Sequence, residues 1–435
     1  MALPIAEIRH QFPLLQRRIS SHPLTYLDNA ATTQKPECVF EAMNVYYRAH
    51  NANAHRGMHP LAEEATETYE ETRKVVQNFV HARRPEEIVF TKSCTEAINL
   101  VAKSWGYANL HPGDRIILTV LEHHSNVIPW LQLKEEIGIE LSWIGIDDHG
   151  NLRYDQYAEE LHHGNIRLVA VTGQSNVLGL QPDLAIIIAG ARAVGAQVLI
   201  DAAQLISHHP IDVQKLDCDF LAFSGHKLYG PTGIGVLYAK HDLLEKMSPM
   251  LGGGGMVQTV DENSFTSLDP PARFEAGTPP VAEAVGLAAA INWLSQFPWK
   301  DIIDHEQRLL KHTRELLQSI DGLHVLGPRP QDLHMSGCLS FTLDDIHPHD
   351  LTEILGREGI CLRAGHHCAQ PLHRRLGVAA STRLSVSLYN TLEEIDRLPA
   401  AIAHAQKILR GTPSTYHPTS LATGELRGAG LTPIT

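Results

Sequence analysis

A carboxylate and an amine follow two apolar runs near the middle of the chain. Asp201 ends the apolar run 198–200, and Lys227 follows the run 220–223 across a short polar turn. The 26 positions from 201 to 227 suit a strand–helix–strand unit. Because ligands of a parallel sheet bind beyond the carboxyl ends of its strands, we expect both side chains at one binding edge.

Pyridoxal phosphate is the cofactor whose chemistry needs such a pair. A carboxylate against the pyridine nitrogen keeps the ring protonated, so that the ring can accept electrons. A lysine beside that cation has a lowered pKa, which makes its amine a nucleophile and a proton carrier. Taken singly, Asp201 could cap a turn and Lys227 could be a solvated loop residue. The functional interpretation of the pair is favoured by glycines that flank the turn, because they let a bound group approach the backbone. These glycines are Gly225, Gly230 and Gly233.

Two further segments could complete a cofactor site. Ser93 and Glu96 have the spacing of a capping box at the start of a helix, with Thr95 between them. Helix N-termini bind phosphate, although an ordinary capped helix has the same sequence pattern. His124 follows the predicted strand 116–120, where an imidazole could stack on the ring, although most isolated histidines are structural.

The elements that position these residues alternate between short apolar runs and helical patterns. This alternation predicts a mostly parallel sheet with helices on both faces. A crossover helix is expected from Pro182 to Val194. The predicted strands are 88–91, 116–120, 139–146, 168–172, 198–200 and 220–223.

The pattern changes after about residue 281. Helices predicted at 282–294 and 304–320 precede apolar runs at 338–341 and 360–362, and a last helix is expected near 393–409. We interpret this part as a smaller α/β domain. The glycine run 252–255 before it fits either a linker or a loop at a subunit interface, whereas the Thr-, Pro- and Gly-rich residues 411–435 predict a disordered tail.

Composition restricts the class of function. The 435 residues carry a formal charge of −13 and no basic block, which argues against nucleic acid as a partner. Charged residues interrupt the N-terminal segment and the most apolar stretch, so we expect neither a signal peptide nor a membrane span. Six cysteines without CxxC spacing suggest free thiols and a cytoplasmic location.

Nine segments in order resemble the group II, SufS-type cysteine desulfurases and selenocysteine lyases of the class V aminotransferase family. The resemblance covers about residues 5–408. It implies the type I fold of pyridoxal-phosphate-dependent transferases. The segments are 27–31 (LDNAA), 95–99 (TEAIN), 122–126 (EHHSN), 175–179 (SNVLG), 201–204 (DAAQ), 224–227 (SGHK), 273–278 (RFEAGT), 363–368 (RAGHHC) and 389–391 (YNT).

The resemblance also implies how the domains divide and which residues form the site. Residues 1–25 would pack on the small domain, 26–281 would form the large cofactor domain, and 282–410 would form the small domain with the catalytic cysteine. Lys227 would bind the cofactor as a Schiff base and move a proton at the substrate. The other implied cofactor residues are Thr95, Ser224 and His226 for the phosphate, Asp201 and Gln204 for the ring, His124 stacked on it, Asn176, and Thr278 of the partner subunit.

In a member of this group, Cys368 would take the sulfur of L-cysteine as a persulfide and release L-alanine. Asn176, Arg383 and Arg363 would bind the substrate carboxylate, and His366 and His367 would favour the thiolate. The other implied properties are a homodimer, a SufE- or SufU-like sulfur-acceptor protein, sulfur supply for iron–sulfur cluster assembly, and activity on L-selenocysteine.

Three departures and three rival interpretations accompany the resemblance. Relatives usually carry other residues at Cys94, at Gly173-Gln174 and at Leu384. An aminotransferase, epimerase or hydrolase of the same fold would need Lys227 but not Cys368, and a non-catalytic sulfur-transfer scaffold would need neither. A metal site at the Gly-His-His-Cys run is disfavoured, since adjacent ligands rarely close a tetrahedron.

Overall fold

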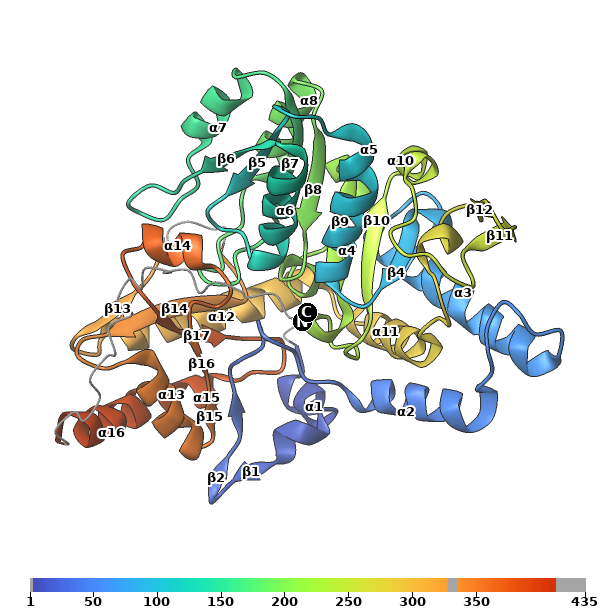
Figure 1. Cartoon of the computed structure of the whole chain (residues 1–435). Helices are drawn as coiled ribbons and strands as arrows, with labels where there is room; N and C mark the ends of the chain where they lie inside the picture. Colours follow the sequence, from blue (N-terminus) through green and yellow to red (C-terminus); the bar gives the residue numbers. More distant parts are fainter. Residues whose placement is uncertain (1–2, 328–334, 412–435) are drawn as a thin grey trace, which may run out of the picture.

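The computed structural model describes residues 3–327 and 335–411 of the chain (Figure 1). A seven-stranded sheet forms its centre in the order β4-β10-β9-β8-β7-β5-β6. Strands β5 to β9 run parallel to one another, and β10 is antiparallel to both of its neighbours. The strands are β4 Ile88–Thr91, β5 Arg115–Thr119, β6 Glu140–Ile144, β7 Ile166–Thr172, β8 Gln197–Asp201, β9 Phe220–Ser224 and β10 Gly235–Ala239.

Alternate side chains of each strand enter two different apolar clusters, one on each face of the sheet. In β8, Val198 and Ile200 belong to one cluster and Leu199 to the other. Helices α4 (Cys94–Leu100) and α6 (Ile128–Ile137) cover the second face, whereas α8 (Leu184–Ala193) covers the first. This burial on both faces explains why the strands are continuously apolar. The predicted mostly parallel α/β fold is confirmed, and β10 is a strand that the sequence prediction omitted.

A second, antiparallel sheet of four strands lies beside the first (Figure 1). Its order is β13-β14-β17-β16, with bounds Leu323–Val325, Cys338–Leu343, Ser381–Ser385 and Arg363–Gly365. Helices that contribute to its apolar cluster are α12 (Trp299–Gln318), α13 (Pro348–Arg357), α15 (Leu392–Asp396) and α16 (Leu398–Gly411). Beyond Gly411, the predicted disordered tail lies outside the described residues.

The N-terminal segment joins this second sheet to the binding edge of the first. Strand β3 (Thr25–Tyr26) pairs in parallel with β15 (Ile360–Cys361). The chain then passes beside β17, where the amide of Ser385 donates to the carbonyl of Leu27 at 2.8 Å. Residues 27–30 are therefore fixed from the C-terminal half of the chain, more than 300 positions away.

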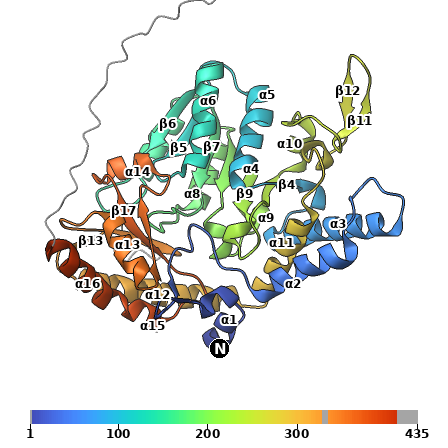
Figure 2. The same ribbon diagram turned by 60° about the horizontal axis from the view of Figure 1, so that its bottom comes forward.

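The remaining elements lie around this framework, and the hairpin of β11 and β12 stands away from the body (Figure 2). No helix in the described part of the chain has the length and apolarity needed to cross a membrane. The remaining helices are α1 Ile5–His10, α2 Glu37–Val45, α3 Pro60–Val80, α5 Tyr107–Asn109, α7 Tyr154–Leu161, α9 Val213–Leu216, α10 His241–Lys246, α11 Val281–Leu294 and α14 Gln370–Arg375. The remaining strands are β1 Arg18–Ile19, β2 His22–Pro23, β11 Val257–Val260 and β12 Phe265–Ser267.

Candidate active site

A cavity of about 320 Å³ opens at the carboxyl ends of β7, β8 and β9. Ten of the twelve site residues predicted from the sequence line it, and His124 and Thr278 do not. The ten are Thr95, Asn176, Asp201, Gln204, Ser224, His226, Lys227, Arg363, Cys368 and Arg383. Six segments far apart in the sequence therefore supply these residues to one cavity.

Asp201 and Lys227 both line this cavity. Asp201 is 3% exposed and accepts hydrogen bonds from the amide of Ala203 at 2.9 Å and from the thiol of Cys94 at 3.3 Å. Burial lowers the pKa of Lys227, and the negative charge of Asp201 opposes this shift. A buried carboxylate can stabilise a cationic heteroaromatic ring, and an amine of lowered pKa can act as a nucleophile.

The N-terminus of α4 meets the end of β9 at one side of the cavity. The amide of Cys94 donates to Ser224 Oγ at 2.8 Å, and Thr95 Oγ1 lies 2.7 Å from Ser125 Oγ. Strand β10 passes close behind, since a Cβ on Gly235 would lie 2.5 Å from the backbone of Ser93. Hydroxyls and free amides at a helix N-terminus form a suitable phosphate cradle.

The structure differs from the sequence prediction at the two adjacent histidines. His123, not His124, lines the cavity, and burial lowers its pKa to about 3, so its ring is neutral. His124 instead faces the segment of Cys368: its amide donates to the Cys368 carbonyl at 2.7 Å, and its Nε2 accepts from the Gln370 amide at 3.2 Å. The strand end was predictable, but the direction of each imidazole depends on the 3₁₀ turn at His124–Asn126.

Arg383 on β17 is buried and lines the same cavity. Its Nη1 donates to the carbonyl of Asn176 at 3.0 Å, and its Nη2 lies 3.2 Å from Asp28 Oδ1. Among the described residues, Arg383 Nε has no hydrogen-bond partner. A buried guanidinium with a vacant donor is suited to an added carboxylate, because buried polar groups are normally paired.

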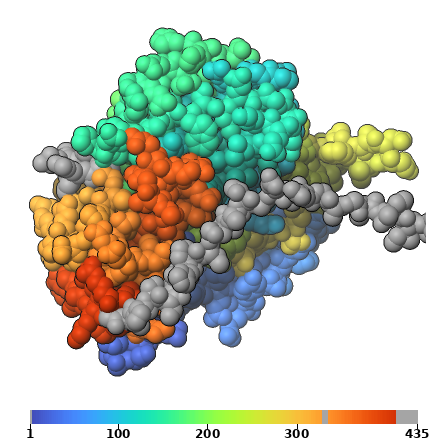
Figure 3. Space-filling model, turned by 60° about the vertical axis from the view of Figure 1, so that its left-hand side comes forward, coloured from blue at the N-terminus to red at the C-terminus, as the bar shows by residue number. Residues whose placement is uncertain are grey.

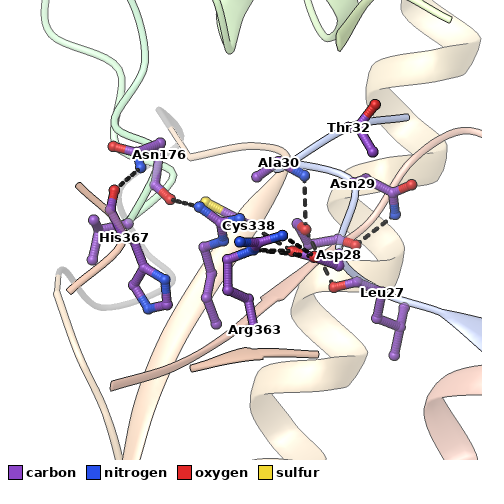
Figure 4. Close-up of polar contacts among 12 residues, drawn as sticks. Leu27, Asp28, Asn29, Ala30, Thr32, Asn176, Cys338, Arg363 and His367 are labelled. Atoms are coloured by element: carbon purple, nitrogen blue, oxygen red, sulfur yellow. Dashed lines mark hydrogen bonds and ion pairs between the residues drawn. The ribbon is translucent and has the colours of Figure 1, made fainter. Parts of the chain in front are cut away.

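Asn176 connects this arginine to the loop that carries the cysteine. Its side-chain amide donates to the carbonyl of His367 at 2.7 Å (Figure 4). His367 and Cys368 both have left-handed backbones, with φ of 51° and 55°. The His367 ring contacts Ser381 Oγ at 3.0 Å, and burial lowers its pKa to about 2. The predicted assistance of a cationic His367 to the thiolate is therefore wrong.

Cys368 differs from the other five cysteines in its exposure. It is an exposed free thiol that also lines the cavity, whereas Cys94, Cys218 and Cys338 are buried. Burial raises the pKa of Cys218 to about 12 and that of Cys338 to about 11, so both remain protonated thiols. The residues after Cys368 form α14, which packs against the loop after β6 (Figure 3). There Arg375 donates to the Ile146 carbonyl at 3.1 Å, which anchors the cysteine loop from its far side.

Lys35 is a residue near the site that the sequence interpretation missed. Its ammonium donates to the carbonyl of His226 at 3.0 Å and to Thr32 Oγ1 at 3.2 Å, directly beside the turn of Lys227. Burial lowers the pKa of Lys35 to about 8. Its position four residues after the 27–31 segment was the available signal, but nothing in the sequence pairs it with residue 226.

These residues fit pyridoxal phosphate and an amino acid. Asp201 suits the ring nitrogen, Lys227 the aldehyde carbon, and the α4 N-terminus the phosphate. The vacant Nε of Arg383 suits the carboxylate of the amino acid. His123 is the imidazole of the adjacent pair that lines the cavity.

Comparisons with known proteins agree with this assignment. A family model described as aminotransferase class-V matches residues 25–398. A cysteine desulfurase of Synechococcus elongatus is 46% identical over 402 residues, and the matched part covers 92% of this chain and 64% of that relative. A cysteine desulfurase of Salmonella agona is 45% identical over 410 residues, which cover 94% of this chain and 100% of that relative. The crystal structure of the cysteine desulfurase CsdA from Escherichia coli, as its S-sulfonic acid, has a TM-score of 0.86 and 40% identity, covering 94% of this chain and 100% of that one.

The fold and the paired Asp201 and Lys227 define an enzyme that uses pyridoxal phosphate. The chain belongs to the class V aminotransferase family, among its cysteine desulfurases.

Proposed function

We propose that the chain converts L-cysteine to L-alanine and leaves the sulfur as a persulfide on Cys368. The observation that carries this proposal is the exposed Cys368 thiol in the same cavity as the buried Asp201 and Lys227. An aminotransferase or epimerase has no use for a thiol at this place. Asn176 and Arg383 hold the substrate carboxylate, which aims the substrate sulfur toward Cys368.

Bound pyridoxal phosphate supplies an electron sink for the electrons of the breaking bond. Lys227 holds the cofactor, removes the proton from the substrate Cα and returns it to the product. The Cys368 thiolate attacks the substrate sulfur, so that a sulfur–sulfur bond forms as the Cβ–sulfur bond breaks. The carbon skeleton leaves as alanine, and a thiol reductant or an acceptor thiol removes the persulfide sulfur.

For the cofactor, we assign Asp201 to the ring nitrogen and Gln204 to the ring hydroxyl, and Thr95, Ser224 and His226 to the phosphate. We replace the predicted stacking residue His124 with His123 and assign His124 to the cysteine loop. Asn176 contacts both the cofactor side of the cavity and the Cys368 loop.

We further infer a SufS-type enzyme that delivers sulfur to iron–sulfur cluster assembly through a SufE- or SufU-like acceptor protein. The loop of Cys368 is short and anchored on both sides, by His124 and by Arg375. A cysteine held in this way cannot carry its persulfide far, so a separate acceptor thiol must come to it. L-Selenocysteine fits the same proposal, since selenium replaces sulfur at the bond that breaks.

We also infer a homodimer in which Thr278 of the partner subunit reaches the phosphate. The chain's own Thr278 is exposed and lines a different cavity, of about 390 Å³, between α3 and the loop before α11. Exposed apolar side chains are frequent on the α2–α3 part and on the β11–β12 hairpin, which supports burial by a second copy. They are Phe40, Val45, Tyr47, Met58, Leu61, Val260 and Phe265. The six free thiols fit a reducing cytoplasm.

The test is L-alanine release from L-cysteine with excess thiol reductant, for the wild type, Cys368→Ser and the matched control Cys361→Ser. We expect alanine from the wild type and the control and almost none from Cys368→Ser. Equal alanine from all three would remove Cys368 from the mechanism, and no alanine from any would favour the aminotransferase or epimerase interpretation. A rate that an added acceptor protein leaves unchanged would contradict the SufS-type assignment.

A further inference from the structure

A buried glutamine fastens the loop of Asn176 to the antiparallel sheet. Gln174 lies just beyond the carboxyl end of β7, lines the cavity and is 1% exposed. Its Nε2 donates to the Ser336 carbonyl at 3.1 Å, and its Oε1 accepts from Ser336 Oγ at 2.7 Å. Gln181 Nε2 donates to both partners, at 3.0 Å to Gln174 Oε1 and at 2.8 Å to Ser336 Oγ. The three side chains therefore form a closed set of hydrogen bonds, in which both ends of a buried amide are paired.

The rest of this loop lies directly on the sheet at strand β14. The Ser336 amide donates to the Gly179 carbonyl at 2.9 Å, and Ser340 Oγ donates to the Val177 carbonyl at 2.7 Å. A Cβ on Gly179 would lie 2.3 Å from the Cys338 carbonyl, so glycine permits this close approach. The loop is thus held against the sheet along its length, and the glutamine makes the side-chain contacts at its start.

The same loop carries the group that orients Arg383. The Asn176 carbonyl accepts from Arg383 Nη1 at 3.0 Å, and the Asn176 side-chain amide donates to the His367 carbonyl at 2.7 Å (Figure 4). A guanidinium is planar, so a fixed acceptor at Nη1 also fixes the direction of Nε, the vacant donor of this arginine. A shift of the loop would therefore turn this donor away from the substrate carboxylate. Gln174 acts on that carboxylate only through Asn176 and Arg383.

Gln174 belongs to one of the three places at which the sequence departs from its relatives, Gly173-Gln174. A Cβ on Gly173 would lie 2.8 Å from Cδ2 of the buried Leu205, so a larger residue would have to displace this leucine. A Cβ on Gly337 would lie 2.7 Å from Gln174 Nε2, so the glycine after Ser336 makes room for the amide. The glutamine and these two glycines therefore fit together as one arrangement.

We propose that Gln174 is a positioning residue for the substrate carboxylate, because it fixes Asn176 and through it the direction of the Arg383 guanidinium. This inference rests on the proposed binding of an amino-acid carboxylate at Arg383. A merely structural role would lower the stability of the protein or weaken every ligand of the cofactor equally. A positioning role weakens only the ligands that carry a carboxylate.

L-Alanine and ethylamine separate these roles, because ethylamine is alanine without its carboxylate. Both are titrated into the holoenzyme at the same pH, with the visible absorption of the cofactor as the readout of binding. In the wild type we expect L-alanine to bind at least about tenfold more tightly, since its carboxylate gains charge-assisted hydrogen bonds. Equal binding of the two ligands by the wild type would remove the carboxylate site at Arg383 and would overturn this inference with it.

Gln174→Met keeps the size of the side chain and removes its hydrogen bonds, and Ser336→Ala removes the partner hydroxyl. We expect both variants to weaken L-alanine binding, by at least about fivefold for Gln174→Met, and to leave ethylamine binding within about twofold of the wild type. The matched control is Gln156→Met. It removes a half-buried amide that bonds the Trp143 carbonyl and the Gly145 amide away from the cavity, and it should change neither ligand.

Steady-state kinetics give a second readout of the positioning role. We expect Gln174→Met to raise KM for L-cysteine by about the same factor as the dissociation constant of L-alanine, with little change in kcat. Equal weakening of both ligands, or unchanged alanine binding in a folded Gln174→Met variant, would assign Gln174 a structural role only. Alanine release from L-cysteine by the wild type and Cys368→Ser, measured in parallel, tests the proposed function separately, because the ligand titrations do not depend on Cys368.

Discussion

The two walls of the cavity are built in different ways. One wall consists of the carboxyl ends of parallel strands, where Asp201 and Ser224 are each 3% exposed and the backbone is continuous with the main sheet. The other wall carries Cys368 and Arg363, both exposed, on the edge and loop of the antiparallel sheet. The buried wall suits a permanently bound cofactor, because fixed groups excluded from water need no rearrangement. The exposed wall suits groups that must meet a substrate and then another protein.

The N-terminal segment is one of several connections between the two walls, beside direct hydrogen bonds such as the one from Asn176 to the His367 carbonyl. Ser385 fixes residues 27–30 on one side, and Gln204 fixes them on the other. Changes on the buried wall should therefore abolish cofactor chemistry. Changes on the exposed wall should affect ligand binding or sulfur transfer while the cofactor stays bound.

The largest expected effect belongs to Lys227→Ala on the buried wall. We expect alanine release to fall by at least ~10²–10⁴-fold, since both the cofactor link and the proton carrier are lost. The visible absorption of the lysine-bound cofactor should disappear as well. The exposed Lys134→Ala serves as the control and should change neither. Full activity of Lys227→Ala would contradict the role assigned to Lys227.

Arg383→Lys should affect binding more than cofactor chemistry. A lysine keeps the charge but loses the planar set of donors that holds Asn176, Asp28 and the substrate together. We expect kcat/KM for L-cysteine to fall by ~10–100-fold, which corresponds to about 1.5–3 kcal/mol for charged hydrogen bonds, mainly through KM. The cofactor absorption should remain. A loss confined to kcat would contradict the proposed role of Arg383 in substrate binding.

Ser385→Ala tests the connection that the N-terminal segment makes between the two walls. Its hydroxyl accepts from the Ala30 amide at 2.9 Å and donates to the Leu27 carbonyl at 3.2 Å in a buried position. Leaving that amide unpaired should lower the free energy of unfolding by ~1–3 kcal/mol in a denaturant titration. Ser319→Ala, at an exposed helix end, should cost less than ~0.5 kcal/mol. Equal stability of both variants would mean that the hydrogen bonds of Ser385 contribute little to the free energy of unfolding.

The smallest effect is a pH dependence that originates at Glu122. Its carboxylate is buried against Thr119 and Asn126, and burial raises its pKa to about 8. Between its ordinary pKa near 4.5 and about 8, the folded chain retains a proton that the unfolded chain has lost. Stability contributed by this group therefore falls as the pH rises through that window.

Glu122→Gln removes this titration. We expect the difference in Tm between Glu122→Gln and the wild type to move in favour of the variant by a few degrees from pH 5 to pH 8, and to change little above it. Asp155→Asn, at an exposed and already ionised carboxyl, is the control. A difference that is constant across pH 5 to 8 would show that Glu122 is already ionised in the folded protein.

The sequence predicted the buried wall better than the exposed wall. Asp201 and Lys227 follow apolar runs, and the ends of parallel strands meet at one edge whatever the details of packing. The antiparallel strand β10 was omitted, although it pairs with both β4 and β9. The sequence analysis expected His124 in the cavity, whereas His123 lines it, because neighbouring side chains of the turn at His124–Asn126 point in different directions.

Long-range pairing explains which residues the sequence analysis missed. Asp28 lies in the segment 27–31, which resembles the family, but the sequence assigns it no role because its partners Arg363 and Arg383 lie more than 300 positions away. Lys35 contacts the carbonyl of His226, which no periodicity or spacing indicates. The predicted roles of Arg383 and Cys368 came from resemblance, and their presence in one cavity is what the structure adds.

Mass spectrometry of the peptide that contains Cys368, after one turnover of L-cysteine without reductant, measures the sulfur transfer itself. We predict one additional sulfur atom on Cys368 and none on the buried Cys338 or the half-buried Cys361. Alanine formed in an amount equal to the enzyme, with Cys368 unmodified, would contradict the proposed mechanism.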